Sequence, residues 1–197
     1  MTTTKPARSA RHRRALVATL AALGVSAILG SSLAAAHGGT NGDSRSPVVV
    51  KVKDDCEPTS FNAAIGPDTC VGDGDTTFGD FIGQLRAEQN APKWRFSRSE
   101  HKVKSGRNLL AVNEGGEFHT FSEVAAFGGG CIPELNVLLG LTPVVECEPL
   151  FAPGVPQAFV DTGVPSGGRL TVPGLAPGVH RFMCLIHPWM RSTITVR

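Results

Sequence analysis

The sequence predicts an all-β sandwich that follows a small N-terminal extension containing one short helix. Two features support the sandwich: the chain has 23 Gly and 14 Pro, and its apolar residues come in short segments separated by turn-forming residues. Short strands joined by many turns are typical of sandwiches and barrels. The helix is expected over 77–85, where apolar residues recur at helical spacing: Phe78, Phe81, Ile82 and Leu85.

From residue 48 onward, segments typical of strands alternate with segments typical of loops. Apolar and β-branched residues predict strands at 48–52, 94–96, 109–112, 118–121, 170–172, 179–184 and 192–196. Two long segments, 56–75 and 127–157, contain several Gly and Pro residues and are expected to be loops. A short helix is expected inside the second loop, within 135–141.

Residues 1–36 have the pattern of a secretory signal peptide. Basic residues precede the apolar segment 15–29, and Ala34–Ala36 offers a small-residue cleavage site. The apolar segment would span about 22 Å as a helix, short of the roughly 30 Å hydrocarbon core of a membrane. We therefore expect an extracytoplasmic protein, secreted, periplasmic or at the cell surface, with no stable membrane span after cleavage. An uncleaved anchor is the alternative.

The charge of the expected mature chain argues against nucleic-acid binding. Of the 19 basic residues, five lie within 1–36, where there is no acid, so 14 basic residues remain against 17 acidic ones. The expected folded part is therefore slightly acidic. A nucleic-acid-binding domain would instead carry a clustered basic surface.

Five cysteines lie outside the expected signal peptide, and an odd number leaves one thiol over. Export implies an oxidising compartment, in which disulfides persist. Cys56–Cys70 and Cys131–Cys147 are preferred among the three possible connectivities, because both close short loops that contain Gly and Pro. Each would stabilise the fold by about 3 kcal/mol. Cys184 is then left free, and metal coordination would protect its thiol from oxidation.

Four potential copper ligands form the most informative pattern. Cys184, His187 and Met190 lie between two expected strands, and His119 follows a Gly-rich turn upstream. A tight turn can bring the thiolate and the imidazole to one ion, while the thioether approaches from the axis. Two His and one Cys in a trigonal plane with a weak axial Met define a blue-copper site. Soft sulfur stabilises Cu(I) and imidazole suits both oxidation states, so such a site exchanges single electrons.

The ligand pattern resembles the plastocyanin/azurin family of cupredoxins. Cys-x-x-His-Pro-x-Met near the C-terminus and Gly-Gly-Glu-Phe-His-Thr-Phe upstream carry the resemblance, which covers 93–197. The two-residue gap between His187 and Met190 is closest to that of the amicyanins. The family implies a Greek-key β-sandwich, one copper ion and single-electron transfer with redox partner proteins, without catalysis. The segment 37–92 has no clear counterpart in the small carriers and is interpreted as the N-terminal extension.

The family also implies roles for residues around the ligands. The second histidine, His187, would sit at an apolar surface where electrons enter and leave, rimmed by Ile186, Pro188 and Trp189. The residue after the first histidine usually hydrogen-bonds the loop after the cysteine. Here that residue is Thr120, where many carriers have Asn.

Other functions use similar residues. A copper-binding or delivery protein for metal homeostasis is the main alternative, but such proteins often carry Met-rich or His-rich tracts, and this chain has only 3 Met. Multicopper oxidases place histidines on both sides of the cysteine, whereas Cys184 is flanked by Met183 and Leu185. A zinc site favours Cys, His or carboxylate ligands and does not select a thioether. We therefore expect an electron carrier rather than an enzyme.

Overall fold

The computed structural model describes residues 46–148 and 150–197 of the chain. The expected signal peptide, 1–36, lies outside the described residues. Among the helices of the described part, none combines the length and the apolar character needed to cross a membrane.

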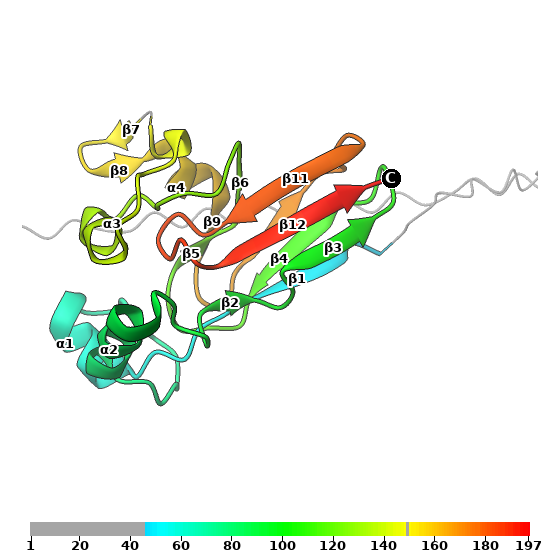
Figure 1. Ribbon diagram of the computed structural model, residues 1–197. Helices are drawn as coiled ribbons and strands as arrows, with labels where there is room; N and C mark the ends of the chain where they lie inside the picture. Colours follow the sequence, from blue (N-terminus) through cyan, green and yellow to red (C-terminus); the bar gives the residue numbers. More distant parts are fainter. Residues whose placement is uncertain (1–45, 149) are drawn as a thin grey trace, which may run out of the picture. The chain divides into compact units, whose positions relative to one another are not determined.

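Short strands form a β-sandwich, as the sequence predicts (Figure 1). The strands are β1 (Val48–Lys53), β2 (Arg95–Phe96), β3 (Glu100–Val103), β4 (Leu109–Asn113), β5 (His119–Thr120), β6 (Ser122–Val124), β7 (Leu150–Ala152), β8 (Val155–Pro156), β9 (Gly163–Val164), β10 (Arg169–Val172), β11 (Gly178–Met183) and β12 (Arg191–Val196). One sheet has the order β10-β4-β1-β2 and the other β3-β12-β11-β6, while β5-β9 and β7-β8 form small ladders.

Alternation of side chains along the strands places one face of each sheet in the core. On β1, Val50 and Val52 are completely buried, whereas the intervening residue of the other face, Lys51, is exposed. The buried rings of Phe121 and Phe182 stack with their centroids 4.4 Å apart. Burial of these apolar side chains is the main term that stabilises the sandwich.

Strand β1 corrects the expected boundary between the N-terminal extension, 37–92, and the sandwich domain, 93–197. β1 lies inside a sheet, where it pairs in parallel with β4, with Val50 opposite Ala111, and antiparallel with β2. The sandwich therefore includes Val48 and the rest of this strand. Alternating apolar residues predict a strand here, but they do not indicate which distant strand it will pair with.

Two helices follow β1, namely α1 (Pro58–Ile65) and α2 (Phe78–Glu88), where the sequence predicts one. The helical spacing of 77–85 falls within α2, whereas α1 lies in a segment that was expected to be a loop. The carboxylate of Glu57 caps α1 by accepting hydrogen bonds from two backbone N–H groups of the first turn, at 2.8 and 2.7 Å. Glu is not among the usual N-cap residues, so the sequence signal for this helix is weak.

The segment 127–157 is more ordered than the expected loop. It contains the β7-β8 ladder, α3 (Pro133–Leu139) and the 3-10 turn η1 (Val145–Cys147), and α4 (Gln157–Thr162) begins at its last residue. The expected short helix within 135–141 therefore corresponds to α3, which starts two residues earlier.

Both expected disulfides are present, Cys56–Cys70 around α1 and Cys131–Cys147 around α3, and Cys184 is the free cysteine of the described part. We call the segment 58–88, which contains α1 and α2, the helical cap. Figure 1 shows the helical cap and α3 at the same end of the sandwich, beside the loop that joins β11 to β12, and α2 contacts α3. The disulfides therefore fasten the two helical segments that surround this loop.

We predict that Val50→Ala lowers the free energy of unfolding by about 2 kcal/mol or more, because it leaves a cavity in the core. Val49→Ala is the matched control: this neighbour is 46% exposed, and the change should be within about 0.5 kcal/mol. Denaturant unfolding of the two variants measures both effects. Equal, negligible effects would mean that β1 is a detached extension.

Candidate metal centre

The loop between β11 and β12 carries three predicted ligands, Cys184, His187 and Met190. Two backbone hydrogen bonds close it: the Cys184 N–H donates to the Met190 carbonyl at 3.0 Å, and the Met190 N–H donates to the His187 carbonyl at 2.9 Å. From outside the loop, the Cys131 N–H donates to the Leu185 carbonyl at 2.5 Å. These hydrogen bonds hold the loop in one tight conformation. Side chains that bind the same ion need their backbone to be held in this way.

Three of the four predicted ligands converge: His119, Cys184 and His187. The two histidine Nδ1 atoms are 3.3 Å apart and lie 3.7 and 3.8 Å from the Cys184 Sγ. A near-trigonal centre with metal bonds of about 2.0 to 2.3 Å and angles of roughly 100° to 120° at the ion separates its donors by roughly 3.1 to 3.8 Å. The spacings therefore fit one first-row metal ion. His119 and Cys184 are 0% exposed and His187 is 3% exposed, so water is excluded from the centre.

Met190, the predicted axial ligand, is 1% exposed and lies at the end of the same loop. Its backbone holds the loop closed through the two hydrogen bonds described above. Coordination by its thioether stays a prediction.

Thr120 links the first ligand strand to the ligand loop. Its hydroxyl oxygen accepts a hydrogen bond from the Leu185 N–H at 2.8 Å, which is the role expected of the residue after the first histidine. The Thr120 N–H also points to the Cys184 Sγ, at 3.4 Å. Thr120 therefore holds both the Cys184 sulfur and the backbone of the next residue, and it makes the contact that the resemblance implies for this position.

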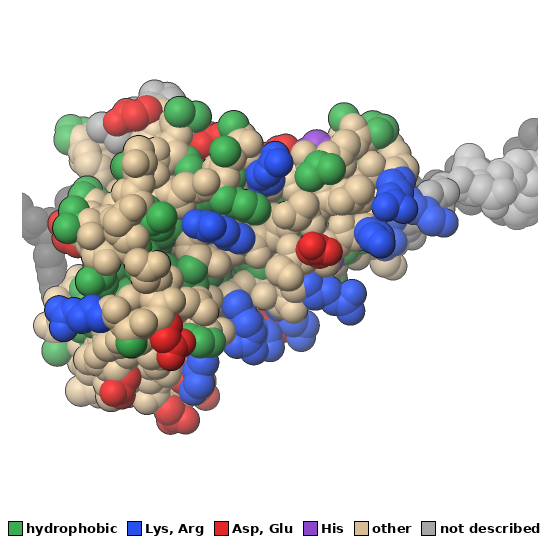
Figure 2. Space-filling model, in the orientation of Figure 1, with side chains coloured by type: hydrophobic (Ala, Val, Ile, Leu, Met, Phe, Trp, Pro, Cys, Tyr) green, Lys and Arg blue, Asp and Glu red, His purple; other side chains and the backbone are tan. Residues whose placement is uncertain are grey.

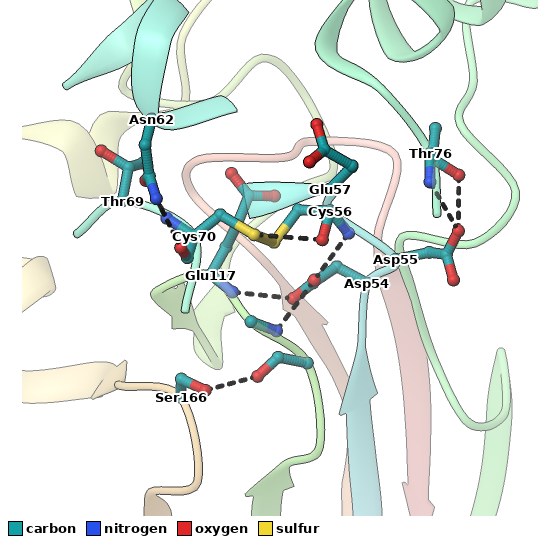
Figure 3. The surroundings of a disulfide bond; sticks show 12 residues. Asp54, Asp55, Cys56, Glu57, Asn62, Thr69, Cys70, Thr76, Glu117 and Ser166 are labelled. Atoms are coloured by element: carbon teal, nitrogen blue, oxygen red, sulfur yellow. Dashed lines mark hydrogen bonds between the residues drawn. A yellow bond between two sulfur atoms is a disulfide. The ribbon is translucent and has the colours of Figure 1, made fainter. Parts of the chain in front are cut away.

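Asp54, directly after β1, is a residue beside the centre that the sequence pattern did not reveal. Figure 3 shows it next to the Cys56–Cys70 disulfide, with hydrogen bonds to its carboxylate. Its carboxylate accepts hydrogen bonds from the His119 Nε2 at 2.8 Å and from the backbone N–H groups of Cys56, Gly116 and Glu117 at 3.2, 2.9 and 3.1 Å. Because Nε2–H donates to the carboxylate, Nδ1 is the nitrogen left to bind a metal.

Burial and hydrogen bonds set the charges of the metal-free centre. Burial raises the pKa of Asp54, but the hydrogen bond from His119, the charge of that histidine and the backbone hydrogen bonds from Gly116 and Glu117 together outweigh burial and lower the pKa to about 2. Burial lowers the pKa of His119, but hydrogen bonds with Asp54 and Cys184 raise it to about 10. Burial raises the pKa of the Cys184 thiol, but hydrogen bonds with both histidines bring it well below its usual range. A protonated imidazole thus lies between a carboxylate and a thiolate, and a metal cation can replace its Nδ1 proton.

The Gly-Gly pair before His119 allows the backbone to reach Asp54. A Cβ atom on Gly115 would collide with the Asp54 carboxylate, and one on Gly116 would lie 2.7 Å from the Cys56 sulfur. Both positions therefore require the absence of a side chain. These glycines, read in the sequence only as a turn, are needed because the chain passes so close to the carboxylate and the disulfide.

The structure corrects the expected position of His187. Its ring is 3% exposed instead of forming an apolar surface edge. The rings of Phe81, from α2, and Trp189 contact it, with centroids 6.2 and 5.4 Å away. Of the expected rim, Pro188 is buried, and Ile186 and Trp189 are half-buried. The helical cap, whose packing the sequence did not indicate, covers this edge.

Glu117 and Trp94 are two further residues that the sequence analysis missed. The Trp94 Nε1–H donates to Glu117 Oε2, and the same oxygen lies 3.7 Å from the His187 Nε2. Burial raises the pKa of Glu117, although the nearby histidine charges lower it. The Trp94 ring stacks on Phe61 of α1 at 5.8 Å. One signal could have indicated Glu117: an acidic residue two positions before the ligand His119.

Comparisons with known proteins find distant structural likenesses. No family model matches the chain, and no curated protein sequence matches it. The chain is similar to a solved purple cupredoxin from Nitrosopumilus maritimus, with 12% identity and a TM-score of 0.39, covering 76% of this chain and 99% of that one. It is also similar to amicyanin from Paracoccus versutus, with 12% identity and a TM-score of 0.37, covering 78% and 83%. At these TM-scores the likenesses add no argument about function.

We predict that Asp54→Asn weakens Cu(II) binding by about tenfold or more, because the predicted ligand His119 loses its charged hydrogen-bond acceptor. Asp55→Asn is the matched control: this neighbouring carboxylate bonds Thr76 and Lys93 instead of a ligand. Its Cu(II) affinity should stay within about threefold of the unaltered protein. Competition titration with a chromophoric chelator measures both, and equal losses would refute a specific role for Asp54.

Proposed function

We propose that the protein is a type 1 (blue) copper protein, a cupredoxin of the plastocyanin/azurin family that carries single electrons. One copper ion would be held by His119, Cys184, His187 and Met190. The observation that carries this proposal is the meeting of a buried thiolate with two imidazole Nδ1 atoms at spacings that fit one ion. When bound, copper would supply the reversible one-electron change that these side chains cannot provide.

The chain's own residues would keep the geometry nearly constant between oxidation states. Asp54 and Thr120 hold His119 and Cys184 through hydrogen bonds, and the closed loop holds His187. Rigid ligands keep the reorganisation that accompanies electron transfer small. The thioether of Met190 favours copper over zinc, because zinc does not select that ligand.

Burial of the ligands favours a carrier over a copper-delivery protein. A delivery protein must hand its ion to a partner through ligand exchange, which needs accessible ligands. Here two ligands are fully buried and His187 is covered by the helical cap. Retention of copper during redox cycling is the property that separates the two functions.

We propose an extracytoplasmic location and redox partner proteins as the source and destination of electrons. Two disulfides support an oxidising compartment, in agreement with the signal-peptide pattern of 1–36. Because His187 is covered, partner proteins would exchange electrons through the side chains around it, of which Trp189 is half-buried and contacts the ring.

The proposed function is tested by the visible absorption spectrum of the protein with Cu(II), followed by a mild reductant and then by reoxidation. We predict an intense blue band that bleaches and returns with copper retained. Cys184→Ser should remove the band, because the colour arises from the copper–thiolate bond. A Ser variant that stays blue, or an unaltered protein that stays colourless, would contradict the assignment.

Replacement of the axial ligand has a different predicted effect. Met190→Leu should keep the blue band and raise the reduction potential, because Cu(II) loses a weak donor while Cu(I) is affected less. Voltammetry of the copper-loaded variant measures the change. An unchanged potential would mean that Met190 is not the axial ligand.

A further inference from the structure

A cavity of about 620 Å³ lies between the helical cap and α3, and His187 lines it. Its volume is within the range of about 300 to 1,000 Å³ that is usual for small-molecule sites. Figure 1 shows the helices around this end of the sandwich, and Figure 2 shows hydrophobic side chains at several places on the same end. A molecule in this cavity would lie beside a ring that belongs to the candidate metal centre.

Apolar side chains form most of the cavity wall. The helical cap contributes the rings of Phe61, Phe78 and Phe81, and α3 contributes Leu135 and Leu138. The three rings pack edge-on or tilted, with centroids 5.3 to 6.2 Å apart. An aromatic guest can continue this packing. The charged side chains of Arg86 and Glu134 line the cavity only at exposed positions. A charged guest would lose its hydration against the apolar inner wall, so the inner part of the cavity favours uncharged molecules.

Of the two carboxyl groups that line the cavity, those of Glu117 and Glu134, only that of Glu117 is buried. Glu117 lines the cavity and is 4% exposed, and its Oε2 accepts a hydrogen bond from Trp94. A carboxyl group keeps acceptor capacity beyond one hydrogen bond, so it can accept a hydrogen bond from a hydroxyl of the guest. An aromatic ring that carries a hydroxyl therefore matches both the wall and this polar group.

Some of the residues that line the cavity are exposed to solvent, so the cavity has an opening at the protein surface. Ile65 of α1 is 49% exposed and Phe118 is 39% exposed, and both line the cavity. Large apolar side chains at exposed positions leave apolar surface in contact with water. A guest that enters beside these two residues would cover that surface. Entry therefore does not require unfolding of the helical cap.

We propose that this cavity binds a small, uncharged phenol or hydroquinone next to the His187 ring. Binding of the phenol depends only on the shape and polarity of the cavity. A role for the bound phenol in electron transfer rests on the proposed function, because it requires His187 to be a copper ligand.

Calorimetric titration of the metal-free protein with 2-naphthol tests the proposal. We expect a dissociation constant on the order of 10 to 100 µM. 2-Naphthalenesulfonate, the same ring with a charge in place of the hydroxyl, should bind about tenfold more weakly or not at all. In NMR spectra, 2-naphthol should also shift the ring resonances of His187.

Filling the cavity provides the matched variants. Leu138→Trp should weaken 2-naphthol binding by about tenfold or more, while Val137→Trp, on the same helix and outside this cavity, should leave it within about twofold. Leu135→Trp is the second filling variant if Leu138→Trp fails to fold, as judged by circular dichroism. Full binding by a folded filling variant would overturn the proposal.

Two further results would overturn the assignment of the guest. Equal affinity for the sulfonate would show that binding does not require an uncharged hydroxyl group, and equal affinity for 1-octanol would identify a site for alkyl chains. The copper spectrum separates this inference from the proposed function. A blue protein that binds no 2-naphthol refutes the cavity proposal alone, and a colourless protein that binds it refutes the proposed function alone.

Discussion

The hydrogen bond between Asp54 and His119 is the interaction on which the rest of the centre depends. Asp54 directly follows β1, an interior strand of its sheet, so the sandwich fixes its position. The same carboxylate accepts hydrogen bonds from Cys56, where the disulfide that encloses α1 begins, and from the Gly-Gly turn before His119. One buried group thus joins the sheet, the helical cap and the first ligand. A buried carboxylate without these donors would be strongly unfavourable, so fold and centre require each other.

The helical cap determines what surrounds the His187 side of the candidate centre. It places Phe81 over the edge of His187 and brings Trp94 and Glu117 into one buried hydrogen-bonded group beside that ring. Burial keeps water and competing ligands away from the candidate centre, which would suit retention of a metal ion. It also removes the bare histidine edge, so under the proposed function an electron donor would act through the side chains around the ring or enter the cavity between the cap and α3.

The sequence predicted the contacts between residues that are close together in the chain, but not those between residues that are far apart in it. Cys184 and His187 are three residues apart, so one turn predicted their convergence, and a Gly-rich turn pointed to His119. Asp54 is 65 residues from His119, and no spacing rule connects them. β1 was expected as a strand, but its place inside the sheet depends on pairing with β4. The first helix was missed because Glu57, an unusual cap residue, starts it.

The measurement that tests the central claim most directly is X-ray absorption spectroscopy at the copper edge of the copper-loaded protein. We predict that the copper has one short sulfur contact and two imidazole nitrogens, with any further sulfur distinctly longer. The same spectrum of Asp54→Asn should show a more disordered nitrogen shell. A shell of nitrogen and oxygen alone, with no short sulfur, would contradict the claim that Cys184 and the two histidines converge on one ion.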